Sequence, residues 1–460
     1  MNGLRRSAAA LLALASVSAV PAVADAQTIT DALAQAYTTS ADLASFRARL
    51  RATDEGVAVA MSGWRPTLTL SGNAGLGWRD AQGQGTSNGF SHVDPRGDSL
   101  TLSESLYRGG RTVAAVRQAD YNVQADRALL LDTEQTVLLA AATAYFDVVR
   151  DQATLDLNVN NEKVLQRQLE ATRDRFQVGE VTRTDVSQAE SRLSAATASR
   201  VAAEGTLATS RATYVRVIGS LPGTLRPAAP LDGLPSSVQE TNALAADRAF
   251  PVVAAKYTEL AARENVDVIF GEMLPLVTLN GSVADTRETI TATGRTKSAT
   301  VSVTATVPLY EAGSVAARTR QAKEVAVQRR MDLDRQTRIS VQTATTAWDA
   351  LVSARAQVIA FDAQVKAAQI ALEGVQQEQL VGSRTVLDVL DAEQELLNAQ
   401  VNLVGAQRNV GVQTYTLRAA VGTLTAQQIA LPVPLYDHER HYDATRYRWF
   451  GLSTNDETQK

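Results

Sequence analysis

The sequence predicts an α+β membrane protein in which two-faced strands alternate with very long helices, and in which this arrangement occurs twice. Three observations predict this fold class. No glycine or proline occurs between Arg111 and Gln177, and these residues would form a helix of about 100 Å at 1.5 Å per residue. Apolar and polar residues alternate after Pro66 and again after Pro275, as in strands with one apolar face. Similar residues also recur at a constant offset of 203 positions, which indicates internal duplication.

The composition excludes several classes of function. The 460 residues carry a net charge of −4, so we expect no basic surface for nucleic acid. The absence of cysteine excludes disulfides, thiol catalysis and cysteine-bound zinc. No nucleophile elbow, phosphate-binding loop or dinucleotide fingerprint is present, so no catalytic residue, cofactor or enzyme is predicted. His438 and His441 lie among acidic residues, but their spacing lacks the helical frame of a zinc motif, so no metal site is predicted.

Residues 1–26 are predicted to be a secretory signal peptide. Arg5 and Arg6 precede an apolar run over 8–23, and the mature chain is expected to begin at Gln27. A membrane anchor is the alternative, but it needs about 20 apolar residues and the run is short. No later stretch is long and apolar enough to span a membrane as a helix, so any crossing must be made by strands.

The first structural repeat is expected to cover residues 27–219. Its predicted elements are a helix over 28–62 with Thr30 or Asp31 as N-cap, strands over 67–78 and 99–106 joined by a loop over 80–98, a helix over 111–177, a turn at Gly179 and a helix over 185–218. A proline-rich linker over 220–239 follows.

The second structural repeat is expected to cover residues 240–424. Its predicted elements are a helix ending near 272, strands over 277–283 and 300–307 joined by a loop over 285–297, a helix over 314–381, a turn at Gly382 and a last helix. Residues 425–460 are expected to form a C-terminal tail.

Four strands per chain cannot close a barrel. Open strand edges cannot lie in lipid, and membrane barrels need about eight strands or more. Two chains would supply eight strands and a filled bore, whereas three would supply twelve and leave space inside. The long helices carry apolar residues at seven-residue spacing, for example Val116, Val123 and Leu130, and should continue as a bundle or tube. The sequence therefore describes a passive conduit.

The run from Val381 to Asp391, followed by Glu393, resembles a motif of the TolC family of outer-membrane efflux and secretion channels. The Leu-Tyr-x-x-Gly junctions at Gly110 and Gly313 and the duplication support the same resemblance. The resemblance implies a homotrimer in the outer membrane, with a twelve-stranded β-barrel continuous with a twelve-helix periplasmic α-barrel. It also implies a periplasmic adaptor protein and an inner-membrane ABC transporter or proton-driven pump as partners.

The resemblance also implies a gate at the periplasmic end. Asp388 and Asp391 would form two acidic rings, and Arg384 would be tethered to the neighbouring hairpin around Thr184 and Asp185. The family often has a tyrosine where this chain has Gln379, so this part of the tether is expected to differ. The alternatives are that both aspartates are solvated surface carboxylates and that Arg384 pairs within its own chain.

The helix lengths place the two glycine turns at the end of the molecule farthest from the strands. Gly179 and Glu180 in the first turn, and Gly382 and Ser383 in the second, are therefore expected to contact the adaptor protein. The alternative is that both glycines merely permit a positive φ in a turn.

The tail carries a subgroup signal. Tyr436, Tyr442 and the Trp449-Phe-Gly run resemble the C-terminal segment of members that serve type I secretion, in which unfolded protein passes to the exterior. Export of drugs or small molecules is the alternative. A periplasmic coiled-coil scaffold is less favoured, because it has no use for two-faced strands.

Overall fold

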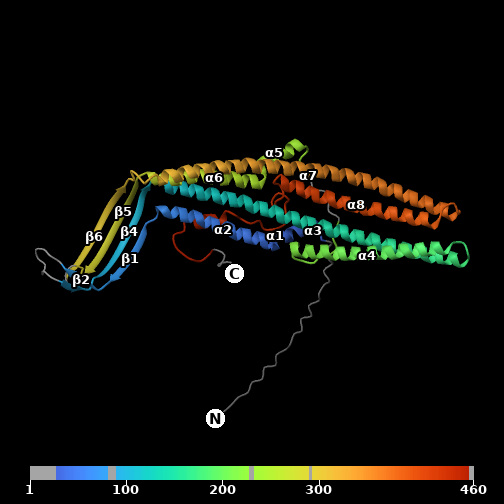
Figure 1. Cartoon of the computed structure of the whole chain (residues 1–460), viewed down its shortest axis with the longest axis horizontal. Coiled ribbons are helices and arrows are strands. Elements are labelled where there is room, and N and C mark those ends of the chain that lie inside the picture. The colour runs from blue at the N-terminus through green and yellow to red at the C-terminus, as the bar shows by residue number, and fades with distance from the viewer. Residues whose placement is uncertain (1–26, 81–89, 227–232, 290–292, 455–460) are drawn as a thin grey trace, which may run out of the picture.

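The computed structural model describes residues 27–80, 90–226, 233–289 and 293–454. The predicted signal peptide lies outside the described residues, as do parts of both strand-connecting loops, of the proline-rich linker and of the tail. The molecule is elongated, with a four-stranded sheet at one end and two helical hairpins that reach away from it (Figure 1).

Apart from the short β2-β3 ribbon of the first half, both halves of the chain contain the same order of elements among the described residues, which confirms the predicted duplication. The first half contains α1 (Ile29–Thr39), α2 (Ala41–Met61), the 3-10 turn η1 (Ser62–Trp64), β1 (Thr67–Ala74), β2 (Gly77–Asp80), β3 (Phe90–Val93), β4 (Arg96–Arg108), α3 (Arg111–Gln177) and α4 (Arg183–Ile218). The second half contains α5 (Val238–Arg248), α6 (Phe250–Phe270), η2 (Gly271–Met273), β5 (Leu276–Arg287), β6 (Arg295–Thr306), α7 (Ser314–Leu380) and α8 (Val386–Ala420), and α9 (Arg440–Arg446) follows. The division of the chain into domains with the predicted limits 27–219 and 240–424 stays a prediction.

The predicted single helix over 28–62 is wrong in one respect, because it breaks at Ser40. Ser40 has an extended backbone, and its side chain accepts a hydrogen bond from the backbone N–H of Leu43 as the N-cap of α2. The N-cap of α1 is Thr28, rather than Thr30 or Asp31; Asp31 is the third helical residue of its capping box. The second half breaks likewise at Ala249, between α5 and α6.

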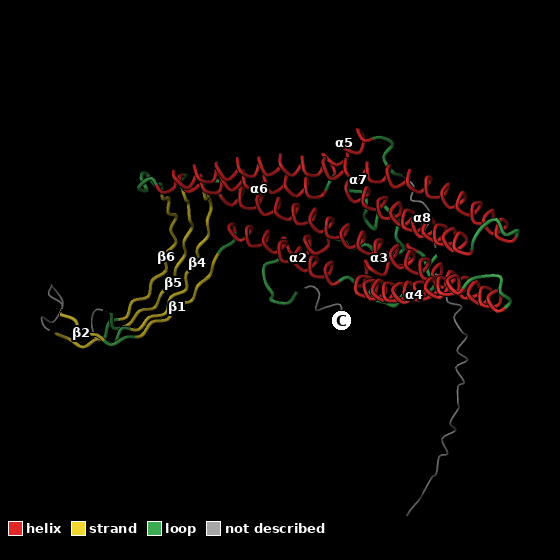
Figure 2. The backbone as a smooth tube through the Cα atoms, turned by 45° about the vertical axis from the view of Figure 1, so that its right-hand side comes forward, coloured by secondary structure: helices red, strands yellow, loops and turns green. Residues whose placement is uncertain are grey.

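The four long strands form one antiparallel sheet in the order β1-β4-β5-β6 (Figure 2). Its register aligns one apolar face, in which Leu70 lies opposite Leu100 and Leu100 opposite Val283. The other face carries hydroxyl groups, such as those of Thr101 and Ser282, which lie opposite one another. The predicted loop over 80–98 is shorter than expected, because β2 and β3 pair there as a separate ribbon.

The sheet is open within one chain. β1 and β6 are its outer strands, and each has a neighbour on one side only. An unpaired edge leaves backbone N–H and C=O groups without partners, which is not tolerated in lipid. The edges must therefore pair with strands of other copies.

The short helices meet end to end along the long ones. The hydroxyl of Thr39 in α1 donates to the carbonyl of Ile218 at the end of α4, at 2.9 Å. In the second half, Gly422 after α8 lies against the backbone of Arg248 at the end of α5. Each 67-residue helix is therefore flanked along its length by a stack of shorter helices, as the helix lengths predicted.

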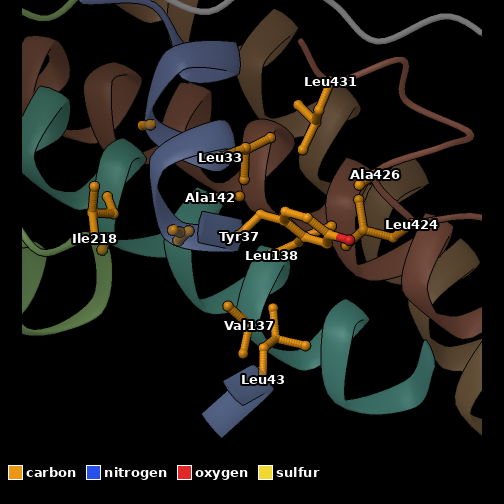
Figure 3. Close-up of a cluster of buried hydrophobic side chains, with 14 of the residues drawn as sticks. Leu33, Tyr37, Leu43, Val137, Leu138, Ala142, Ile218, Leu424, Ala426 and Leu431 are labelled. Atoms are coloured by element: carbon orange, nitrogen blue, oxygen red, sulfur yellow. The ribbon is translucent and has the colours of Figure 1, made fainter. Parts of the chain in front are cut away.

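The main hydrophobic core lies where α1, α2, α3 and α4 meet the segment after α8. Leu33 and Tyr37 of α1 pack there with Leu138 of α3, and Leu424 and Leu431 cover them (Figure 3). This core fixes the position of α3 relative to the chain ends. No helix among the described residues is long and apolar enough to cross a membrane.

The C-terminal segment is packed against the first half rather than forming a free tail. His441 of α9 lies with Nδ1 at 3.0 Å from Oδ2 of the buried Asp54 in α2. The hydroxyl of Tyr442 donates to Asp120 of α3 at 2.7 Å. Burial is the main reason that the pKa of the Asp54 carboxyl is raised, and its contact with His441 opposes this shift.

Candidate functional site at the helical tip

The two hairpin turns have the same backbone geometry. Gly179 and Gly382 have φ angles of 81° and 82°, a left-handed conformation that favours glycine. The N–H of Glu180 donates to the carbonyl of Arg175, and the N–H of Ser383 donates to that of Glu378. These bonds close the ends of α3 and α7. Both turns lie at the end of the molecule farthest from the sheet, as predicted (Figure 1).

A capping box starts each outgoing helix. Thr182 and Asp185 exchange hydrogen bonds at the start of α4, and Thr385 and Asp388 do so at the start of α8. The Thr385 backbone N–H lies 2.9 Å from Oδ2 of Asp388 and its hydroxyl 2.8 Å from the same oxygen. These bonds hold the pKa of Asp388 below its ordinary value.

Arg384 pairs within its own turn. Its Nε donates to Oε2 of Glu378 at 2.9 Å, and Nη1 lies 4.0 Å from Oδ1 of Asp388. In a single copy of the chain, Arg384 therefore pairs with carboxylates of its own chain, which is the alternative to a tether between neighbouring hairpins. Thr184, in the first helical turn of α4, is exposed, and Asp185 beside it is half-buried.

Asp391 carries a link between the two hairpins that was not predicted. Its Oδ1 accepts a hydrogen bond from Nη2 of Arg192 in α4, at 2.5 Å. The sequence contains no local signal for this pair, which is separated by 199 residues. The capping residues Thr182 and Thr385, by contrast, could have been found from their Thr-x-x-Asp pattern.

A small apolar cluster joins the hairpins below the turns. Leu165 of α3, Ala196 of α4 and Leu390 of α8 are buried together. Glu393 of α8 is buried near this level, and its Oε2 has no hydrogen-bond partner among the described residues. Burial raises the pKa of Glu393, and the charge of Arg167 partly opposes that rise.

The turns also expose apolar side chains. Val178 is 72% exposed, Leu380 67% and Val381 80%. Gln379, by contrast, has a partly buried side chain. Its Nε2 atom is buried and has no hydrogen-bond partner among the described residues. The tip therefore combines an apolar end surface with charged groups just behind it, which suits contact with a protein or a narrow passage.

The arrangement offers no evident chemistry. Among the described residues, no group of three potential ligands could hold a metal ion. His438 and His441 belong to the packed C-terminal segment, in which the carbonyl of His438 accepts from Arg127.

Comparisons with known proteins agree with the geometry. The chain matches the family described as outer membrane efflux protein over residues 32–220 and 243–423. It is 38% identical over 432 residues to the outer membrane efflux protein BepC of Brucella suis biovar 1, covering 94% of this chain and 93% of that protein. It is 28% identical to the proteases secretion protein PrtF of Dickeya chrysanthemi, covering 93% of this chain and 94% of that protein.

The fold is also similar to a solved structure. The CmeC outer membrane channel of Campylobacter jejuni superposes with a TM-score of 0.76 at 15% sequence identity, covering 91% of this chain and 89% of that one. Three copies of the four-stranded sheet form the twelve-stranded barrel, and the helices continue it into the periplasm. The chain therefore belongs to the outer membrane efflux protein family, as a trimeric, non-enzymatic TolC-like channel of the outer membrane.

Proposed function

We propose that this channel is the outer-membrane exit duct of a pump that exports small toxic molecules. The observation that carries the proposal is the 38% identity, along nearly the whole chain, to a protein whose name states efflux. The structure is consistent with a passive role, because the described residues form a barrel segment and a tube without chemistry. Energy must then come from an inner-membrane pump, coupled through a periplasmic adaptor protein.

The adaptor is proposed to contact the exposed turns. The first turn, between α3 and α4, contains Gly179 and Glu180, and the second, between α7 and α8, contains Gly382 and Ser383. Both turns lie at the end of the molecule farthest from the sheet (Figure 1). The apolar side chains beside them give a docking protein a surface to bury. Photocrosslinkers at Glu180 and Ser383 should capture the adaptor in cells, whereas a crosslinker at the exposed Arg330 of α7 should not. Crosslinks only to reagents added outside the cell would contradict the proposal that the turns lie on the periplasmic side.

Arg384, Asp388 and Asp391 are proposed to line and hold a closed periplasmic aperture. In a trimer, three-fold symmetry would place three copies of each aspartate around one axis. Arg384 would exchange Glu378 of its own turn for Thr184 or Asp185 of an adjacent hairpin, and Gln379 would take a place in this tether. The exposure of Arg384, half of whose side chain is accessible, permits that exchange.

Secretion of unfolded protein is the second candidate. Similarity to a proteases secretion protein over 93% of this chain favours it. The aromatic C-terminal segment, predicted to mark type I secretion members, favours it as well. In this case the inner-membrane partner would be an ABC transporter.

Complementation distinguishes the two candidates. The gene for this channel is removed from its host, and the strain is tested for accumulation of a fluorescent dye, for antibiotic susceptibility and for proteins in the medium. Raised dye accumulation that the wild-type chain reverses would support efflux. Loss of secreted protein without a change in dye accumulation would support secretion instead and overturn the first proposal.

A further inference from the structure

The apolar face of the sheet becomes charged near the end farthest from the helices. Leu70, Leu100, Val283 and Ala299 lie opposite one another in one row across the four strands. Residues two apart on a strand share a face, so the next two rows lie on the same face as this one. The first of these rows contains Asp98, Asp285 and Lys297, and the second contains Arg96, Arg287 and Arg295.

The charges in these rows do not balance. Four are cationic and two are anionic. Nε of Arg295 lies 2.9 Å from Oδ1 of Asp285, and Nη2 of Arg287 lies 3.5 Å from Oδ2 of the same carboxylate. Arg96 and Lys297 have no ion pair with the side chains that the structure describes. Like charges directly opposite one another destabilise a sheet, so three arginines in one row are unexplained by the fold alone. An external anion would compensate them.

The rows lie at the outer boundary of the membrane. A strand needs about 9–11 residues to cross the hydrocarbon region. Counted from Leu276 at the start of β5, this length ends at 284–286, beside Asp285 and Arg287. The apolar face must point toward lipid, because the other face carries the hydroxyl groups. The charged rows therefore face lipid headgroups rather than acyl chains or the lumen.

A groove connects the apolar row to the charged one. It has a volume of about 480 Å³, and its lining includes the apolar Leu70, Leu100 and Val283 together with the charged Asp98, Asp285 and Lys297. The groove has apolar walls, and the row of Arg96, Arg287 and Arg295 lies just beyond its charged end. This order of groups fits an amphipathic molecule whose anionic head reaches past the groove to the arginines. Arginine is well suited to such a head, because its planar fork can bind two phosphate oxygens at once.

We propose that this face binds the phosphate-bearing headgroup of an outer-leaflet lipid. Arg96, Lys297 and the exposed side of Arg287 contact the phosphate, and an acyl chain lies in the groove. Asp285 holds Arg287 and Arg295 in place from behind. Each trimer carries three such sites around the barrel.

The test uses a double variant, Arg96→Gln with Lys297→Gln, which removes two charges without breaking any ion pair described above. The matched control is Lys323→Gln with Arg330→Gln, which removes the same charge from exposed positions of α7. Purified trimers are titrated with bisphosphorylated lipid A, and with the same lipid after removal of its phosphates, by native mass spectrometry. The same spectra report whether each variant is trimeric.

We expect wild type and control to bind bisphosphorylated lipid A, and the double variant to bind it at least about tenfold more weakly. Phosphate-free lipid should bind weakly to all three proteins. Equal binding by wild type and the double variant overturns the site, and equal binding of the two lipids overturns the role of phosphate. If the double variant is not trimeric, Lys297→Gln alone is titrated, and unchanged binding by it overturns the contact of Lys297.

Discussion

The Nη2 atom of Arg192 lies 2.5 Å from Oδ1 of Asp391, and this contact joins the first helical hairpin to the second near the periplasmic tip. Both side chains are partly exposed, so the pair should contribute less than about 1 kcal/mol per chain. A trimer contains three such ion pairs, so their free energies add. The closed state of the tip could therefore depend on the pairs of Arg192 with Asp391.

Arg192→Gln should raise the open probability of the channel. Loss of up to about 1 kcal/mol in each of three chains would shift the equilibrium between closed and open states by up to roughly a hundredfold. Single-channel recordings in planar bilayers measure the open probability as the fraction of time that the channel is open. Arg173→Gln is the matched control, because it breaks a pair with Glu190 inside one hairpin at a similar level. Equal open probability for both variants would show that the link between hairpins does not hold the tip closed.

Arg384→Ser should also raise conductance and increase antibiotic leakage into cells, if Arg384 tethers adjacent hairpins. Within one chain the described losses would be surface pairs with Glu378 and, more distantly, Asp388, which do not involve neighbouring copies. Glu378→Gln removes the same intrachain pair and is the control. A leak in the control as large as that in Arg384→Ser would assign the effect to the turn itself.

Asp388→Asn combined with Asp391→Asn should weaken cation selectivity and block by multivalent cations. Three copies of each carboxylate near one axis attract cations, and the amides do not. The reversal potential in a salt gradient measures selectivity. Asp362→Asn, at an exposed position of α7, should leave the reversal potential unchanged. If the double variant also leaves it unchanged, the aperture lies elsewhere.

Glu393→Gln should stabilise the channel at neutral pH by about 1 kcal/mol or more, because it removes a buried charge whose Oε2 has no hydrogen-bond partner among the described residues. The folded-state pKa of Glu393 is raised, so folding favours its protonated form. The penalty in the wild type is therefore relieved as the pH falls through that pKa. Melting temperatures at pH 7 and pH 5 should show a gain that shrinks on acidification. Glu395→Gln, at an exposed position, should show no such gain.

His441→Ala should destabilise the packing of the C-terminal segment by about 3 kcal/mol, because it leaves the carboxylate of Asp54 buried without its partner. Adding Asp54→Asn should restore part of the loss, since the amide carries no charge. Limited proteolysis after α8 reports the release of the segment. His438→Ala should release the segment less than His441→Ala does, because the described hydrogen bond of His438 is made by its backbone carbonyl. Cleavage of both histidine variants at the same rate would contradict this role for His441.

Local patterns predicted most of the fold. Residues between Arg111 and Gln177 lack any helix breaker, and they form α3 with those limits. The glycine turns and the alternating strands were predicted for similarly local reasons. The break at Ser40 was missed, because a serine inside an amphipathic pattern does not by itself show whether it caps a helix or lies within one.

The site could be predicted only in part. Thr182 and Thr385 have local signals, whereas the contact of Arg192 with Asp391 depends on how two hairpins lie against each other. The buried pair of Asp54 and His441 spans 387 residues, and the tail gave no sign that it would pack. Contacts of this kind are decided by tertiary packing rather than by any spacing along the chain.

The hydroxyl face of the sheet has a consequence for what the barrel can distinguish. On β5 the lumen-facing positions from Thr278 to Thr286 carry hydroxyl, amide and methyl groups, and Asn280 there accepts a hydrogen bond from Ser103. Such a wall wets easily and holds no fixed charge, so a passing molecule meets neither an electrostatic well nor a barrier. The outer opening should therefore admit different molecules without distinguishing between them by charge. Selection between cargoes must then occur at the periplasmic end, about 100 Å away along α3 and α7.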